Sequence, residues 1–255
     1  MNAFVLKIIA LTAMLIDHAG AAFPQYVPFE SRIIGRLTFP IFVYLIADGF
    51  RHTRNPKKFL FRLFAFAMIS EIPFDLAITR VRVGDFWQAI SFINYTNIFY
   101  TLFLGGLAIF IIQQIYREIP EDALKKDRMI SQLIAIAIAA IPTLGLMWLA
   151  EVLHTDYAGY GVLFIVLMYV IKPKWLRLAV FAIMNVLQHR WLIDWLRAGH
   201  SFYGMSGWVM MIFATLLTVP LIAFYNGKRG PSLKWLFYVA YPAHLAVLAV
   251  IAWFL

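Results

Sequence analysis

The sequence predicts an all-α membrane protein, a polytopic bundle of about nine transmembrane helices. Of its 255 residues, 63% are hydrophobic and 14% are charged, and the mean hydropathy is +0.79. A soluble domain is about 45–50% apolar and about 25% charged. Apolar runs that approach the roughly 20 residues of a membrane span recur along the whole chain. They leave no room for a separate soluble domain, so we expect a single membrane domain over residues 1–255.

Nine apolar runs, each bounded by polar, proline or glycine residues, are the expected spans. They cover residues 3–22, 33–50, 59–78, 97–116, 129–150, 158–171, 175–192, 205–225 and 235–254. The sixth run is short for a span, which is typical of a tilted or re-entrant segment, or of one that extends past these limits.

Basic residues predict the orientation, because cytoplasmic loops carry an excess of Lys and Arg. Most of the 22 Lys and Arg fall in the loops at 51–62, 117–128, 172–177 and 228–234, which nine spans place on one side together with Lys7. The N-terminus is therefore expected in the cytoplasm. The net charge of +9 is a topology signal in this setting, and it does not indicate nucleic-acid binding.

Several functional classes are excluded. The chain has no Cys, so it can form neither a disulfide nor a thiolate nucleophile. Walker, dinucleotide-binding, serine-elbow and zinc-protease motifs are absent from the sequence. Its six histidines lack the close pairing that metal ligands show, so no metal site is expected.

The first predicted span carries two adjacent ionisable residues, Asp17 and His18. A charged side chain within a bilayer costs several kcal/mol unless it is paired or hydrated. Neighbours on a helix point about 100° apart, so we expect Asp17 to meet another helix while His18 faces elsewhere. A hydrogen-bonded pair that only fixes helix packing is the structural alternative. We favour the functional interpretation, in which His18 accepts a proton.

Further ionisable residues are expected at the same outer depth. Arg36, near the start of the second span, has Asp17 as an available anion. Glu71 and Asp75 are four residues apart in the third span, so they share a helix face, and Arg36 is again a candidate partner. Pro73 bends this segment. An acid–arginine network with a purely structural role is the alternative to a catalytic one.

Two basic turns are expected on the cytoplasmic side. The residues singled out are Arg51, Arg54, Asn55, Lys57 and Lys58 in the first turn, and Asn226, Lys228 and Arg229 in the second. A topology signal that contacts anionic lipids explains most such turns. The sharper hypothesis is a clamp for a ligand with several phosphates, since guanidinium and ammonium groups bind phosphate oxygens.

Polar residues at three further positions complete the candidate site. Asn97 enters the fourth span in a polar run and is a hydrogen-bond donor at outer depth. His244 lies near the middle of the last span, close to Tyr241. A lone histidine on an apolar face usually packs in a core, but at mid-membrane it is expected to line a polar cavity. His244 is therefore counted with Asn97 and Tyr241 among the candidate substrate and oxyanion contacts.

Taken together, these motifs resemble the TraX family. The resemblance rests on Leu6–Leu11, Leu15–Gly20, Gly35–Pro40, Gly49–Asn55, Ser70–Asp75, Tyr225–Gly230 and Tyr241–His244. It implies a multi-pass acyltransferase of the bacterial inner membrane, similar to the one that N-acetylates processed F-type conjugative pilin. The run Phe39–Phe42 also resembles the wider group of transmembrane acyltransferases.

The resemblance implies acetyl-CoA as the acyl donor, bound at the two basic turns from the cytoplasm. His18, oriented or charge-balanced by Asp17, would deprotonate an amine or hydroxyl at the outer leaflet. Arg36, Asn97 or Tyr241 would stabilise the oxyanion, and both direct transfer and an acetyl-histidine intermediate fit. The acceptor would be a pilin or peptide N-terminus, a sugar or a lipid.

A proton-coupled transporter is the rival interpretation, because Asp17, His18, Arg36, Glu71, Asp75 and His244 would also suit a proton relay. The chain shows no internal repeat, which many transporters have. A membrane scaffold without catalysis would leave the buried ionisable residues without a role.

Overall fold

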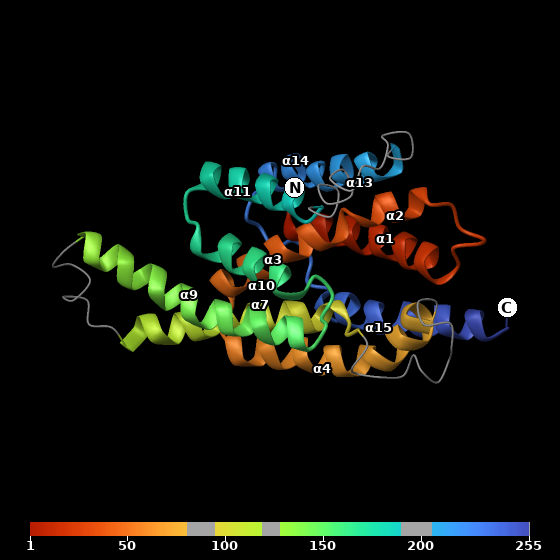
Figure 1. Ribbon diagram of the computed structural model, residues 1–255, viewed down its shortest axis with the longest axis horizontal. Coiled ribbons are helices and arrows are strands. Elements are labelled where there is room, and N and C mark those ends of the chain that lie inside the picture. Colours follow the sequence, from red (N-terminus) through yellow and green to blue (C-terminus); the bar gives the residue numbers. More distant parts are fainter. Residues whose placement is uncertain (81–94, 119–127, 190–205, 255) are drawn as a thin grey trace, which may run out of the picture. The chain divides into compact units, whose positions relative to one another are not determined.

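The computed structural model describes residues 1–80, 95–118, 128–189 and 206–254, most of which are helical (Figure 1). The all-α class that the sequence predicts is confirmed. The helical segments are α1 (Ala3–Ala22), α2 (Glu30–Gly35), α3 (Thr38–His52), α4 (Pro56–Phe74), the π-helical turn η1 (Asp75–Thr79), α7 (Ile98–Glu118), α9 (Arg128–Val152), α10 (Ala158–Val170), α11 (Lys174–Leu187), α13 (Ser206–Leu216), α14 (Thr218–Ala223) and α15 (Lys234–Phe254).

Each predicted span overlaps a helix or two consecutive helical segments. The end of the 175–192 run and the first residue of the 205–225 run lie outside the described residues. Within the described residues, the helices long and apolar enough to cross a membrane are Ala3–Ala22, Glu30–His52, Ile98–Glu118, Leu133–Val152 and Trp235–Phe254. The chain thus has the character of a multi-pass membrane protein. The nine crossings and their orientation stay predictions.

The surface of α9 fits a lipid environment. Ile141 is 73% exposed and Trp148 is 68% exposed on this helix, and Leu144 is exposed between them. A soluble protein rarely exposes a continuous apolar face, whereas lipid tails solvate such a face well. These side chains are therefore expected to face lipid.

Proline and glycine shape two of the predicted spans. The 33–50 span is interrupted, because α2 ends at Gly35 and α3 begins at Thr38. Pro40 has no N–H to donate to the carbonyl of Arg36, which favours a break before it. In the third span, Pro73 lies near the end of α4, and the π-helical turn η1 follows it. Such turns are frequent at functional sites.

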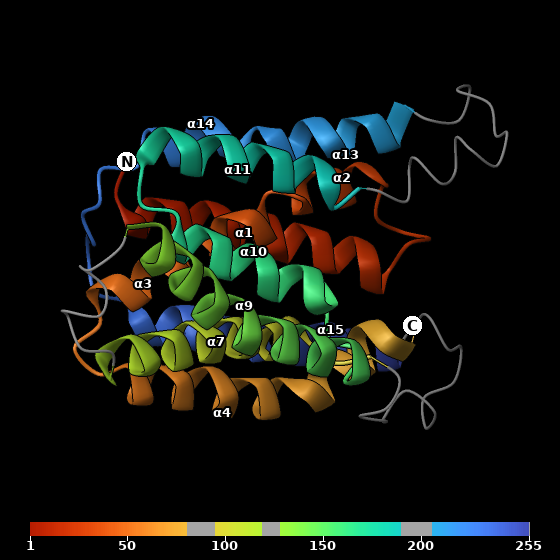
Figure 2. The same cartoon turned by 60° about the vertical axis from the view of Figure 1, so that its left-hand side comes forward.

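The chain divides into two compact units. The first comprises Met1–Leu45, Ile69–Ser91 and Pro173–Leu255, and the second comprises Ile46–Met68 and Phe92–Lys172. The expectation of a single domain over residues 1–255 stays a prediction. In the first unit, α1 packs against α2, η1 and α15, and α13 packs against α2 and α11. Figure 2 shows α11 beside α13 and α14.

The second unit is built around α7, which packs against α9 and α10. Gly105 of α7 lies directly against Ile165 of α10, where a Cβ would come within 2.9 Å of the Ile165 Cβ. Small residues allow this close approach of two helices in a membrane.

We expect Gly105→Ala to lower the thermal unfolding temperature of the detergent-solubilised protein, because the added methyl group separates α7 from α10. Overpacking of this kind costs about 1–3 kcal/mol. Gly145→Ala on α9 is the matched control, since its Cβ would meet nothing within 4 Å. Equal transition temperatures for the two variants would contradict the close α7–α10 contact.

Candidate active site

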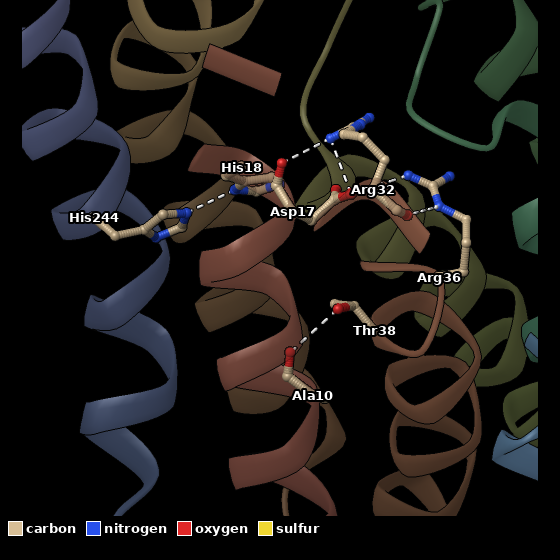
Figure 3. A network of polar contacts seen from close by, with 7 residues as sticks. All are labelled: Ala10, Asp17, His18, Arg32, Arg36, Thr38 and His244. Carbon is tan, nitrogen blue, oxygen red and sulfur yellow. Dashed lines mark hydrogen bonds and ion pairs between the residues drawn. The ribbon is translucent and has the colours of Figure 1, made fainter. Parts of the chain in front are cut away.

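Asp17 of α1 lies between two arginines, Arg32 of α2 and Arg36 just after it (Figure 3). Nη1 of Arg32 lies 2.9 Å from Oδ1 of Asp17 and donates to the Asp17 backbone carbonyl at 2.9 Å. Nη2 of Arg36 donates to the same Oδ1 at 3.2 Å. The Asp17 side chain is only 13% exposed, so the two cations offset the cost of keeping its charge away from water. The predicted Asp17–Arg36 ion pair is confirmed.

Glycines allow α2 to lie against the end of α1. A Cβ on Gly35 would overlap the Asp17 side chain, and a Cβ on Gly20 would overlap the Ser31 hydroxyl. Arg32 and Arg36 are four residues apart and therefore point to one side. Nε of Arg36 also donates to the Arg32 carbonyl at 3.0 Å. The close backbone approach and the two guanidinium groups together hold α2 against the end of α1. We call this contact of Asp17 with Arg32 and Arg36 the Asp17 corner.

His18 turns away from Asp17 and contacts α15. Its Nδ1 lies 2.6 Å from Nε2 of His244, and Nδ1 of His244 lies 2.7 Å from the carbonyl oxygen of Ala240. The Tyr241 ring stands edge-on to both imidazoles, with centroid distances of 5.7 Å to His18 and 5.6 Å to His244. The structure thus brings three predicted site residues together, and we call His18, Tyr241 and His244 the histidine cluster.

The orienting partner of His18 differs from the one that the sequence predicts. Asp17 was expected to orient His18, but its carboxylate is engaged by Arg32 and Arg36. Adjacent residues on a helix point in different directions, so one carboxylate cannot serve both the arginines and its neighbour. His244 occupies that position instead.

Glu71 and Asp75 form a buried acidic stripe on α4 and η1. They are 0% and 1% exposed, and the nearby side chains of Ser70 and Thr79 are buried as well. The η1 turn packs against α1 and α15, the two helices that carry the histidine cluster. The stripe therefore belongs to the same unit as the cluster. An ion pair of Arg36 with either carboxylate stays a prediction.

A cavity of about 350 Å³ lies beside the Asp17 corner. The residues that line it are Gly20, Ala21, Pro24, Val27, Phe29, Arg32 and Ile78. Its walls are mostly apolar, and the guanidinium of Arg32 is their charged group. Arg32 thus both contacts Asp17 and lines this hollow.

Two residues of the first basic turn have structural roles. Nη2 of Arg51 donates to the carbonyls of Met168 and Tyr169 at 2.6 and 2.7 Å, which caps the C-terminus of α10. Oδ1 of Asn55 accepts from the Lys58 N–H at 2.8 Å and caps the N-terminus of α4. Arg54, Lys57 and Lys58 are exposed, so their side chains can meet a ligand.

The second basic turn is tied to the start of α1. The Lys228 carbonyl accepts from the Ala3 N–H at 2.8 Å, and a Cβ on Gly230 would collide with Asn2. Asn226 closes the turn by accepting from the Lys228 N–H at 3.0 Å. The side chains of Lys228 and Arg229 are exposed.

Asn97 has a capping role as well. Its Oδ1 accepts from the Phe99 N–H at 3.0 Å at the start of α7, and its Nδ2 donates to the Ala67 carbonyl at 2.8 Å. Both ends of this fully buried amide are thus occupied by backbone groups. Its assignment as an oxyanion donor stays a prediction.

Arg32 is not among the site residues predicted from the sequence, yet it contacts Asp17 more closely than Arg36 does. Its position four residues before Arg36, at the edge of an apolar run, was the available signal. Within the described residues, no three His, Asp or Glu side chains are grouped to hold a metal ion.

The model of the TraX protein family matches residues 3–252 of this chain. A curated relative from Dichelobacter nodosus, named "Probable fimbrial assembly protein FimC, serogroup H1", is 28% identical over 261 aligned positions. The match covers 100% of this chain and 97% of the relative. No solved structure matches the chain.

We expect Asp17→Asn and Arg36→Gln each to lower the unfolding temperature, and the double variant to lose less than the sum. The reason is that either change removes the same ion pair, and contacting residues show coupling energies of about 0.5–3 kcal/mol. A thermal double-mutant cycle in detergent measures this coupling.

Asp48→Asn and His52→Gln are the matched cycle, because this contact is longer, at 3.6 Å, and His52 is 66% exposed. Its coupling should fall in the range of about 0–1 kcal/mol typical of surface pairs. Additive losses for Asp17 and Arg36 would contradict the role of their ion pair.

Proposed function

The chain belongs to the TraX family, and on that premise we propose that it is an integral-membrane acetyltransferase. It would move an acetyl group from cytoplasmic acetyl-CoA to an amine or hydroxyl acceptor at the outer leaflet. One observation carries the proposal: an imidazole pair joins α1 and α15, two helices apolar enough to span a membrane. Polar pairs at such positions are costly and usually functional.

His18 is the proposed general base. In the reaction, the acceptor nitrogen or oxygen forms a bond to the acetyl carbonyl carbon, and the thioester C–S bond breaks. His18 takes the proton that the acceptor loses and returns it to the leaving thiolate, so the products are the acetylated acceptor and free CoA. General base catalysis of this kind contributes about 10²–10⁴-fold to a rate.

Tyr241 is the proposed oxyanion donor. Its ring borders both imidazoles, and it is 3% exposed. A phenolic hydroxyl in a dry site can stabilise the negative charge that develops on the carbonyl oxygen. Arg36 is directed at Asp17 and Asn97 at backbone groups, so Tyr241 is the better placed of the three residues that the sequence indicates.

Donor and acceptor would approach from opposite ends of α1. The contact of Ala3 with Lys228 places the second basic turn at the start of α1. His18 lies 15 residues further along, or about 22 Å at 1.5 Å per residue. Exposed Lys228 and Arg229 would meet the phosphates of the donor from the cytoplasm. The contribution of Arg54, Lys57 and Lys58 that the sequence predicts is tested separately below.

The proposed acceptor is the N-terminus of a pilus subunit. Pilin acetylation in the family and a relative named for fimbrial assembly both support this choice. The cavity beside the Asp17 corner would receive the acceptor, because its apolar walls suit an apolar segment of a pilin. A sugar or a lipid headgroup is the alternative acceptor class. The proposed location is the bacterial inner membrane, with the N-terminus in the cytoplasm.

We expect the purified protein in nanodiscs to transfer isotope-labelled acetyl from acetyl-CoA to a pilin N-terminal peptide, as followed by mass spectrometry. His18→Gln should lower turnover by about 10²–10⁴-fold because the base is lost. Thermal unfolding identifies a variant that fails to fold. Turnover near that of the wild type would overturn the assignment of His18.

The same preparation separates the two rival functions. If the wild type acetylates neither peptide, sugar nor lipid acceptors, and liposomes that contain it show proton-driven solute uptake, the acetyltransferase proposal is overturned in favour of a transporter.

We expect the double variant Lys57→Gln, Lys58→Gln to bind CoA about 5–50-fold more weakly, since each charged hydrogen bond contributes about 1.5–3 kcal/mol before screening by solvent. Calorimetry measures the dissociation constant. Arg117→Gln is the control, because Arg117 is also exposed but lies outside both turns. An unchanged dissociation constant in the double variant would show that Lys57 and Lys58 of the first turn do not bind CoA.

A further inference from the structure

The contact between His18 and His244 is an in-plane hydrogen bond. Their ring planes are inclined by 16° and the centroids lie 4.9 Å apart, while Nδ1 of His18 is 2.6 Å from Nε2 of His244. Rings stacked face to face stay about 3.5 Å or more apart at every atom pair. The much shorter nitrogen distance therefore requires that the rings meet edge to edge, with a lone pair aimed at an N–H.

The Ala240 carbonyl determines which nitrogen carries each proton. A carbonyl oxygen only accepts hydrogen bonds, so Nδ1 of His244, 2.7 Å away, must carry a hydrogen. In neutral His244, Nε2 then has the lone pair and accepts a hydrogen bond. Nδ1 of His18 must therefore be the donor, and the lone pair of neutral His18 lies on its Nε2.

The basic nitrogen of His18 has no hydrogen-bond partner among the described residues. The hydrogen bond of His18 there is the one through Nδ1 to His244. The residue as a whole is partly exposed. Nε2 thus keeps its lone pair, as a general base requires.

Among the described residues, neither Asp17 nor Tyr241 sets this tautomer. The carboxylate of Asp17 is bound to Arg32 and Arg36. Tyr241 meets both imidazoles through its ring, at 5.7 and 5.6 Å between centroids. It restricts the tilt of the two rings, whereas the proton position follows from the Ala240–His244–His18 chain.

We propose that His244 is a positioning residue for His18: it holds the neutral imidazole in the Nδ1–H form and so makes Nε2 the atom that takes the acceptor's proton. The proposal rests on the proposed acetyltransferase function. When Nε2 is protonated, Nδ1–H continues to donate to His244, which stabilises the imidazolium without a further proton transfer. Neither bond-making nor redox chemistry occurs at His244 itself.

This role differs from that expected for His244 from the sequence, which places it among the substrate and oxyanion contacts. A donor to the substrate oxygen would need a free N–H. Both ring nitrogens of His244 are instead engaged, one with Ala240 and one with His18.

The first test is independent of catalysis. Protein with ¹⁵N-labelled histidine in nanodiscs is studied by solid-state NMR, with assignment from His18→Gln and His244→Phe. We expect a protonated Nδ1 and an unprotonated Nε2 for His18, and a through-bond coupling between His18 Nδ1 and His244 Nε2. A His18 ring protonated at Nε2 in the neutral state, or no coupling, would overturn the proposal.

The second test compares three substitutions at His244 in the acetyl transfer assay. His244→Phe keeps a ring but has no acceptor, so kcat should fall about 10²-fold or more while KM for acetyl-CoA stays the same. His244→Gln keeps a side-chain oxygen that can accept from Nδ1–H and should restore at least a tenth of the wild-type kcat. His244→Ala should resemble His244→Phe.

Val247→Phe is the matched control, since Val247 is on the same helix and 58% exposed; its kcat should be unchanged. A purely structural role would lower kcat equally in His244→Phe and His244→Gln, in step with their thermal stability, and that result would overturn the proposal. If the wild type transfers no acetyl group, the proposed function fails, but the NMR test still decides the tautomer.

Discussion

A carboxylate inside an apolar helix must be neutralised by the protein, because lipid offers neither water nor counterions. In this chain, Arg32 and Arg36 neutralise the carboxylate of Asp17. The two arginines can reach Asp17 because α2 lies against the end of α1, where Gly35 and Gly20 have no side chain in the way. The break between α2 and α3 turns the chain at this corner.

The same corner leaves His18 available for chemistry. With Asp17 held by arginines on one side of α1, the imidazole on the next position faces α15 and meets His244. In the proposed reaction, charge neutralisation and proton transfer would thus belong to adjacent residues on different faces of one helix. The opposite end of α1 is tied to the second basic turn through Ala3 and Lys228. Under the proposed function, one helix would therefore link the binding of a negatively charged donor with proton transfer.

Residues with similar chemistry have different roles in the basic turn at 51–58. Arg51 caps the end of α10, and Asn55 caps the start of α4, so backbone groups satisfy both side chains. Lys57 and Lys58 belong to the same turn as Arg51 and Asn55, but their side chains are exposed. A basic turn in a sequence can therefore contain residues that stabilise the fold and residues that are candidates for ligand binding. The hydrogen-bond partners of each side chain in the structure distinguish the two kinds.

The sequence by itself determined the all-α class, the membrane character, the Asp17–Arg36 pair and the helix face that Glu71 and Asp75 share. These follow from composition, apolar run length and helical spacing, which are local properties. Only the tertiary structure decided that Arg32 joins Asp17, that Arg51 and Asn97 meet backbone carbonyls, and that His18 pairs with a residue 226 positions away. The spacing of residues along a helix determines the face on which a side chain lies. The partner that it meets there depends on which helices pack together, and that is settled by contacts between distant segments of the chain.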